Sequence, residues 1–155
     1  MALSAIWSLN TTGFLELRWE ATEAALATLR TVATERTFAP GEVILSQGDT
    51  SEEMYFILEG QVCIVRAAAN QPSSDLAALG PFSSFGEVAF LTGCPRTASA
   101  IAETAVRALS LTRGQAKRLW TEDRRLALDL YQVLTRALVH SLLQAGRFPN
   151  QLPQT

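Results

Sequence analysis

The chain is short of the residues from which many catalytic and metal sites are built. Among its 155 residues it has one histidine, His140, and two cysteines, Cys63 and Cys94. The histidine has no cysteine or acidic companion at ligand spacing, so the sequence predicts no metal site. It also offers no Ser-His-Asp set and no paired carboxylates. We therefore expect neither an enzyme nor a cofactor.

Two cysteines are too few for a disulfide framework, and a reducing compartment is the default expectation. The chain also lacks a basic surplus, because 13 Lys and Arg face 15 Asp and Glu for a net charge of −2. Proteins that neutralise the phosphates of a nucleic acid duplex usually carry such a surplus. A duplex is therefore not the expected partner.

Long apolar runs are missing as well. The N-terminal stretch MALSAIWSLN has neither a basic leader nor enough apolar residues for a signal peptide or a membrane span. We expect a cytoplasmic protein, or a domain on the cytosolic face of a larger one. Apolar residues still make up 48% of the chain, which is enough for one domain over residues 1–155.

The order of patterns along the chain is helix, strands, then helices. Apolar residues recur at helical spacing over residues 12–34. Residues 36–111 carry short runs rich in Val, Ile, Phe and Tyr between turn residues, which is typical of a small sandwich or barrel. The predicted strands are 42–45, 54–58, 61–66, 75–79 and the region 97–111, with a hairpin tip at 69–74.

Residues 113–146 are predicted to form two closing helices. Thr112 and Gln115 have the capping-box spacing for a helix that runs from Arg113 toward Trp120. Residues 121–123 start a second helix with an apolar stripe over 126–142, and Gly146 is its expected stop.

Residues 85–100, FGEVAFLTGCPRTASA, place a carboxylate and a guanidinium at the two ends of a short apolar segment. A strand that becomes a helix at Gly86 exposes backbone N–H groups, which attract an anion together with the helix dipole. Residues 93–95 turn the chain back, so that Arg96 and Thr97 can face the same spot. An arginine fork beside a hydroxyl suits a phosphate.

Glu87 conflicts with a phosphate alone, because a carboxylate repels an anion. A ribose hydroxyl is a neutral partner that donates to a carboxylate, and acidic residues recognise ribose in this way. One short segment can read both groups only if the ligand holds them close together. A nucleotide whose phosphate is cyclised onto its own ribose meets that condition.

In these segments the chain resembles cyclic nucleotide-binding domains, which are shared by the catabolite activator protein, kinase regulatory subunits and gated channels. The family's phosphate-binding cassette reads F-G-E-aliphatic-small-apolar and then P-R-[STA]-[AS], and residues 85–90 and 95–98 match it. A second pattern, with G-D and an aliphatic run closed by glycine, matches residues 44–49 and 54–60. Ser51 stands where the family prefers a smaller residue.

The resemblance implies an α+β fold, with an antiparallel β-barrel of double-stranded β-helix or jelly-roll topology, one N-terminal helix and two C-terminal helices. It implies that Glu87 accepts from the ribose 2′-OH and that Arg96 pairs with the exocyclic phosphate oxygens. The other implied ligand-binding residues are Gly86, Val88, Ala89, Thr97 and Ala98. The pocket-wall candidates are Val62, Ile64, Leu79 and Phe85, and the lid candidates are Arg136 and His140.

The predicted function is a regulatory module that binds cAMP or cGMP as a ligand and signals by moving its C-terminal lid helix. The alternative is a ligand-silent homologue that serves as a structural or dimerisation module. The stripe over 126–142 would allow a homodimer, or the last helix could act on a covalently linked effector domain. Relatives that bind DNA carry a helix-turn-helix after the lid helix, and the 12 residues after Leu143 are too few for one. We therefore expect no DNA-binding domain in this chain.

Overall fold

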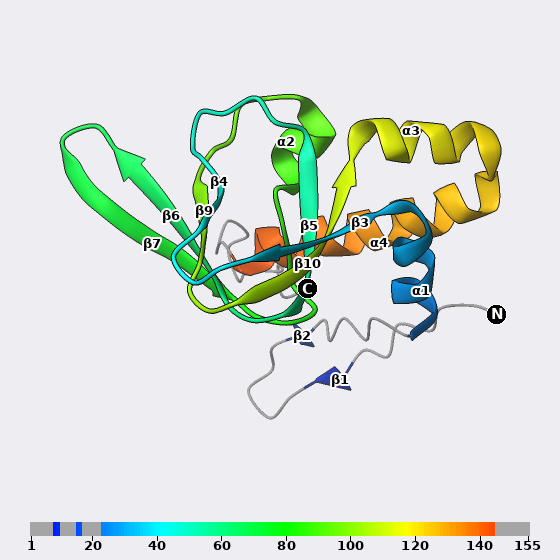
Figure 1. Ribbon diagram of the computed structural model, residues 1–155, viewed down its shortest axis with the longest axis horizontal. Helices are drawn as coiled ribbons and strands as arrows, with labels where there is room; N and C mark the ends of the chain where they lie inside the picture. Colours follow the sequence, from blue (N-terminus) through cyan, green and yellow to red (C-terminus); the bar gives the residue numbers. More distant parts are fainter. Residues whose placement is uncertain (1–7, 10–14, 17–22, 145–155) are drawn as a thin grey trace, which may run out of the picture.

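The computed structural model describes residues 8–9, 15–16 and 23–144. A β-rich half is joined to a helical half, and the β6–β7 hairpin projects from the β-rich side (Figure 1). The elements are β1 Ser8–Leu9, β2 Leu15–Glu16, α1 Glu23–Val32, β3 Thr34–Phe38, β4 Val43–Leu45, β5 Glu53–Glu59, β6 Val62–Ala68, β7 Gln71–Leu79, β8 Ser84–Phe85, α2 Glu87–Thr92, β9 Ser99–Ala102, β10 Val106–Thr112, α3 Arg113–Glu122 and α4 Arg124–Gln144.

Two four-stranded antiparallel sheets form the β-rich half of the described chain, with strand orders β3-β10-β5-β8 and β4-β9-β6-β7. One buried apolar cluster takes residues from both sheets, such as Ile57 and Val106 from the first and Val62 and Ala102 from the second. The sheets therefore face each other around a shared core. This is the predicted jelly-roll arrangement, built as an open sandwich instead of a closed barrel.

Strand β5 is buried on both faces, which explains its unbroken apolar run. Tyr55 and Ile57 belong to the core between the sheets. Met54 and Phe56 point the other way, into a second core with the helices. That second core contains side chains of all four helices, including Leu29, Phe90, Leu119 and Leu130. The first sheet is thus a middle layer, and β5 joins the sandwich to the helices.

The predicted closing helices are confirmed. Thr112 caps α3, because its hydroxyl accepts from the Gln115 amide at 3.1 Å while the Gln115 side chain accepts from the Thr112 amide at 2.8 Å. The predicted start of the second helix at 121–123 is placed slightly early, because α3 runs through Glu122 and α4 begins at Arg124. Asp123 lies just before α4, and its Oδ1 accepts from the amide of Leu126 at 3.1 Å. The predicted stop at Gly146 lies outside the described residues.

The predicted helix over residues 12–34 is wrong in its first half. Residues 15–16 form β2, where Leu15 pairs with Leu9 of β1, and the helix α1 spans only Glu23–Val32. The sequence Leu15-Glu16-Leu17 alternates apolar and polar residues, which is a strand pattern that the wider helical spacing obscured. Residue 34, assigned to the helix, begins β3.

The predicted strands need several corrections, and the strand β3 was not among those predicted. The region 97–111 contains two strands, β9 and β10, separated by residues 103–105. The hairpin tip at 69–74 is shorter than expected, because β7 already begins at Gln71. Asn70 turns the chain there with a φ of 66°, a conformation that asparagine adopts more easily than most residues. The strand β8 was not predicted, because its two residues, Ser84 and Phe85, are too few to show an alternating pattern.

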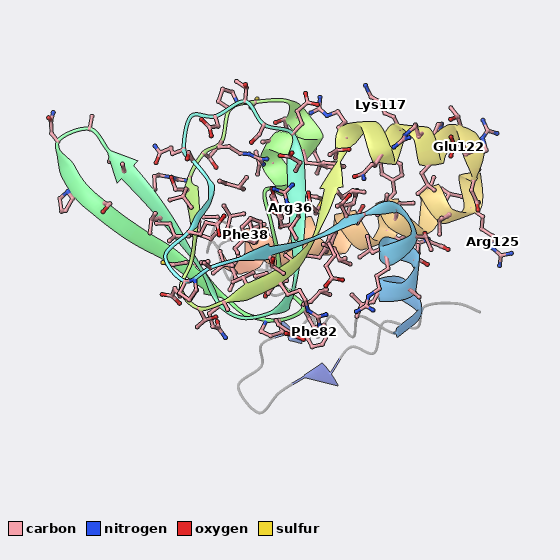
Figure 2. The ribbon with its side chains drawn as sticks, in the orientation of Figure 1. Arg36, Phe38, Phe82, Lys117, Glu122 and Arg125 are labelled. Atoms are coloured by element: carbon pink, nitrogen blue, oxygen red, sulfur yellow. The ribbon has the colours of Figure 1, made fainter. Side chains whose placement is uncertain are left out.

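A strained turn precedes β8. The amide of Ser83 donates to the carbonyl of Gly80 at 3.2 Å, Pro81 follows Gly80, and Phe82 has a φ of 67°. This is the pattern of a type II turn, which favours glycine at the position of Phe82. The Phe82 ring is 54% exposed at the edge of the sandwich (Figure 2), so burial does not offset the strain.

We expect Phe82→Gly to unfold at higher urea concentration than Phe82→Ala. Both variants remove the exposed ring, but only glycine relieves the left-handed strain, which costs about 1–2 kcal/mol for other residues. Glycine's greater freedom in the unfolded chain offsets about 0.4–1 kcal/mol of that gain. Equal or reversed stabilities in equilibrium urea unfolding would show that the turn is not strained.

Candidate functional site

Gly86 joins β8 to α2 at the centre of the predicted cassette. Its φ of 87° lies in the left-handed region. A Cβ at this position would lie 3.0 Å from Nη1 of Arg96 and 3.0 Å from the carbonyl oxygen of Glu53. Both the backbone conformation and the close approach therefore require glycine.

Arg96 lies under this turn and is only 4% exposed. Its Nε donates to Oγ of Ser51 at 3.0 Å, its Nη1 to the carbonyl of Gly86 at 3.0 Å, and its Nη2 to the carbonyl of Glu53 at 2.5 Å. The guanidinium thus joins the segment 51–53 to the Gly86 turn, which is distant from it in the sequence. A buried arginine with this many acceptors is held in one orientation.

The charge of Arg96 is balanced by acids around it. Burial lowers the pKa of the guanidinium, and the nearby carboxylates of Glu53, Asp49 and Glu87 oppose that shift. The Glu53 carboxylate is 4.0 Å from Nη2. The site therefore places one buried cation among several acids, rather than a cluster of cations.

Glu87 is the first residue of α2, and its side chain is also buried, at 6% exposure. The hydroxyl of Ser84 donates to its Oε1 at 2.8 Å. Because Gly86 precedes Glu87 and its carbonyl holds Arg96, the turn brings the carboxylate and the guanidinium to one place. Both side chains are thus buried at the Gly86 turn, and the Glu87 carboxylate is one of the charges that act on the Arg96 guanidinium.

The second sequence pattern meets the first through the backbone. The amide of Gly48 donates to the carbonyl of Arg96 at 2.9 Å, and the amide of Arg96 donates to the carbonyl of Asp49 at 2.8 Å. The G-D turn therefore pairs with the residue that carries the guanidinium. This pairing explains why the two patterns, which lie far apart in the sequence, form one site.

The other predicted site residues fall into three groups. Val88 and Thr97 are exposed, Ala98 is half-buried, and Ala89 is buried. The carbonyl of Thr97 accepts from Nε of Arg66 at 3.1 Å. The proposed pocket walls, Val62, Ile64, Leu79 and Phe85, all belong to the core between the sheets. The side chains of the lid candidates Arg136 and His140 lie outside the described ones.

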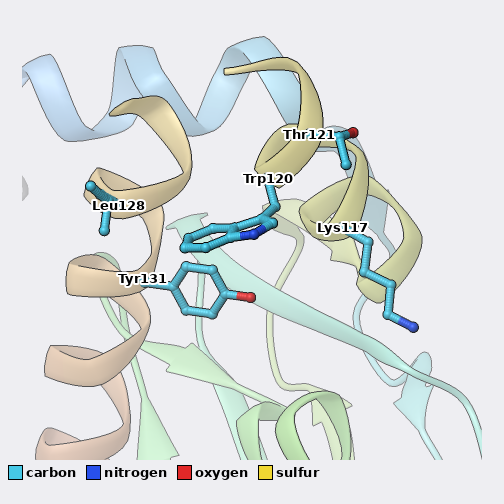
Figure 3. Close-up of a pocket in the computed structure, with 5 residues that line it drawn as sticks. All are labelled: Lys117, Trp120, Thr121, Leu128 and Tyr131. Atoms are coloured by element: carbon cyan, nitrogen blue, oxygen red, sulfur yellow. The ribbon is translucent and has the colours of Figure 1, made fainter. Parts of the chain in front are cut away.

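A pocket of about 520 Å³ lies elsewhere, between α3 and α4 (Figure 3). Its walls are Lys117, Trp120, Thr121, Leu128 and Tyr131. The rings of Trp120 and Tyr131 meet edge to face, with centroids 5.7 Å apart. None of the predicted ligand-binding residues lines this pocket.

Comparison with known proteins decides the family. The family model of the cyclic nucleotide-binding domain matches residues 35–123. The chain belongs to this family. The matched region runs from β3 to the end of α3 and contains the whole site around Gly86, Glu87 and Arg96.

Relatives agree with this assignment. A CRP-like cAMP-activated global transcriptional regulator of Mycobacterium tuberculosis is 34% identical over 116 residues, covering 74% of this chain and 51% of that protein. This chain thus spans about half the length of that curated relative. The catabolite activator protein of Thermus thermophilus superposes with a TM-score of 0.65 at 26% identity, over 83% of this chain and 61% of the other.

The fold is also that of a cyclic nucleotide-binding domain from Methylobacillus flagellatus, with a TM-score of 0.74 at 21% identity over 86% of this chain and 76% of the other. Within the described residues, no helix is long and apolar enough to cross a membrane. Nor do three or more His, Cys, Asp or Glu side chains gather there as candidate metal ligands.

Sequence reasoning missed the residues that hold the two charged groups. Ser51, Glu53 and Ser84 supply the contacts to Arg96 and Glu87. Ser51 was noted only as a departure from the family pattern, yet its hydroxyl is an acceptor for Arg96. The backbone carbonyl of Glu53 leaves no signal in the amino-acid sequence.

We expect Gly86→Ala to destabilise the domain more than Gly48→Ala. Both glycines have a positive φ, but a Cβ at Gly48 meets nothing within 4 Å, whereas one at Gly86 meets Arg96 and Glu53 at 3.0 Å. Gly48→Ala should cost about 1–2 kcal/mol from strain alone, and Gly86→Ala about 1–3 kcal/mol more by displacing the guanidinium from its acceptors. Urea unfolding of both variants measures the difference, and equal losses would contradict the packing argument.

Proposed function

We propose that this domain binds a cyclic nucleoside monophosphate, cAMP or cGMP, and acts as a regulatory module without catalysis of its own. The observation that carries the proposal is the convergence of two buried, oppositely charged side chains, Glu87 and Arg96, at the Gly86 turn. The M. tuberculosis relative is described as cAMP-activated, which supports a cyclic nucleotide as ligand. A cytoplasmic location is part of the same proposal.

Arg96 has more N–H groups than its protein contacts use, although its side chain is only 2% exposed, so a phosphate would reach them by moving the surrounding turn. A guanidinium has five N–H groups. Three of them donate to Ser51, Gly86 and Glu53, so two remain for phosphate oxygens. The ring phosphate of a cyclic nucleotide carries a single negative charge, which one arginine can balance.

Glu87 would take the ribose. Its carboxylate is fixed by the Ser84 hydroxyl at the start of α2. An ionised carboxylate accepts hydrogen bonds only, so a ribose 2′-OH is a suitable donor and a second phosphate oxygen is not. The pair therefore favours a ligand that carries phosphate and ribose hydroxyl side by side.

The proposed output is a movement of α4 over the bound ligand. Such a change needs a closed state that binds the nucleotide more tightly than the open one. Phe90 of α2 packs in the same core as Leu130 and Leu134 of α4, so the cassette and the last helix are in physical contact. The partner that receives the signal would be an effector domain linked to α4 or a second copy of the chain.

We expect Arg96→Ala to weaken nucleotide binding by about 10- to 100-fold in titration calorimetry, because charge-assisted hydrogen bonds contribute about 1.5–3 kcal/mol. Glu87→Gln should lose about tenfold, and its amide oxygen can still accept from Ser84, which preserves the local fold. Arg107→Gln is the matched control, since Arg107 pairs with Glu59 at the opposite end of β5 from Glu53. Unchanged affinity in both site variants would refute the assignment.

The second candidate function is a ligand-silent dimerisation module, and one observation favours self-association in either case. Leu128 and Tyr131 lie three residues apart on α4 and are 54% and 43% exposed. The sequence continues this spacing with Thr135, Leu138 and Leu142. Positions spaced three and four apart form the seam of a two-stranded coiled coil.

We expect the domain to have the mass of a dimer in light scattering and Leu128→Glu to shift it to that of one chain. Val43→Glu is the control, because Val43 is 51% exposed on β4, away from the helices. A dimer that withstands Leu128→Glu would place the interface elsewhere. If neither cyclic nucleotide binds but the dimer forms, the ligand-silent function is the correct one.

A further inference from the structure

Arg113, the first residue of α3, reaches back to the cassette helix. Its Nε donates to the carbonyl of Phe90 at 2.9 Å and its Nη2 to the carbonyl of Ala89 at 3.1 Å. Its Nη1 is 3.3 Å from Oε1 of Glu52. One side chain therefore links α3, the end of α2 and the segment that leads into β5.

The two carbonyls belong to the last turn of α2, where hydrogen-bond partners are scarce. A continuing helix would supply the amide of Cys94 to Phe90, but that amide donates to the hydroxyl of Thr92 at 3.2 Å. The amide of Gly93 donates to Ala89 at 2.8 Å and ends the helix. Arg113 thus satisfies the Phe90 carbonyl, which α2 leaves open, and adds a second donor at the Ala89 carbonyl. Its charge also complements the negative end of the helix.

The segment 51–53 holds both arginines of this region. Ser51 and Glu53 accept from Arg96, and Glu52 between them pairs with Arg113. A shift of Arg96 that pulls on Ser51 or Glu53 therefore also moves the partner of Arg113. The two guanidiniums contact the cassette at its two ends, Gly86 before α2 and Phe90 in its last turn.

We propose that Arg113 is the positioning residue that couples the cassette helix α2 to α3 and, through it, to α4. Its role in ligand response rests on the proposed nucleotide binding, but the coupling itself is a property of the free protein. The rival route is apolar, because Phe90 packs in one core with Leu119 of α3 and Leu130 of α4. Replacing Arg113 leaves that packing in place, so the two routes can be separated.

The first experiment needs no ligand. Lys117→Gly is introduced to weaken α3 at an exposed position. Its effect on α2 is measured by NMR as the amide hydrogen exchange rates of Phe90 and Gly93, whose amides are hydrogen-bonded in α2. Glycine in a helix interior costs about 1 kcal/mol, so we expect about fivefold faster exchange in α2 when the helices are coupled. In the Arg113→Met background the same Lys117→Gly change should leave α2 exchange unaltered.

Arg118→Met is the matched control, because Arg118 is an exposed arginine of the same helix. It should leave the fivefold effect intact. Amides of β9 report any global loss of stability, against which the α2 rates are corrected. If α2 still responds to Lys117→Gly in the Arg113→Met background, the apolar route carries the coupling and the proposal is wrong. Should Arg113→Met fail to fold, Arg113→Lys takes its place, since lysine lacks the planar guanidinium fork that contacts both carbonyls and Glu52.

The second experiment adds cAMP or cGMP at saturation. In the wild type we expect slower exchange in both α2 and α3, and in Arg113→Met slower exchange in α2 alone. Slowing of both helices in the variant would overturn the proposal. If neither nucleotide changes exchange in the wild type, the proposed ligand is wrong, while the ligand-free comparison still decides the role of Arg113.

Discussion

A guanidinium that is 4% exposed must find its acceptors inside the protein, because a buried charge without partners costs several kcal/mol. Arg96 finds them at Ser51, Gly86 and Glu53, on two loops that no short-range signal brings together. The hydrogen bonds of Arg96 therefore hold the two loops together, and the same bonds fix the orientation of its guanidinium. The position of Glu87 follows, since it is bonded to the Gly86 turn and anchored from the strand side by Ser84.

The middle sheet carries this arrangement to the rest of the molecule. β5 begins at Glu53, beside Arg96, and its next residues alternate between the core of the sandwich and the core under the helices. Tyr55 stacks on Phe85 just before the Gly86 turn, with ring centroids 5.1 Å apart. Close-packed cores deform little by bending. They respond to a displacement by changing from one packing arrangement of their side chains to another. β5 therefore connects the segment that holds Arg96 to both cores.

The amino-acid sequence predicted those parts of this site that depend on a particular side chain or on a backbone conformation that requires glycine. Gly86 is recognisable because its backbone conformation requires glycine, and Glu87 and Arg96 because charged residues are unusual beside an apolar segment. The spacing of Thr112 and Gln115 alone indicates the start of a helix. The contacts that hold Arg96 were not predictable, because two of its three acceptors are backbone carbonyls, which every residue has. The N-terminal helix was placed too early because Leu15 fits helical and strand periods alike. Arg113 was read as the start of α3, and nothing in its surroundings in the sequence points back to α2.

The contacts of Arg96 also set a condition on any ligand that is to act as a signal. A phosphate that takes only the two remaining N–H groups leaves Ser51 and Glu53 where they are, so binding is tight and changes little around it. A phosphate that draws the guanidinium away from the Glu53 carbonyl binds more weakly, because the hydrogen bond to Glu53 is lost. The same movement would free the segment 51–53, in which Glu52 pairs with Arg113. A ligand shifts an equilibrium only by the difference in its affinity for the two states. If the domain binds and signals as proposed, affinity and signalling compete at the same side chain, and a switching site binds its ligand more weakly than a site that only holds it.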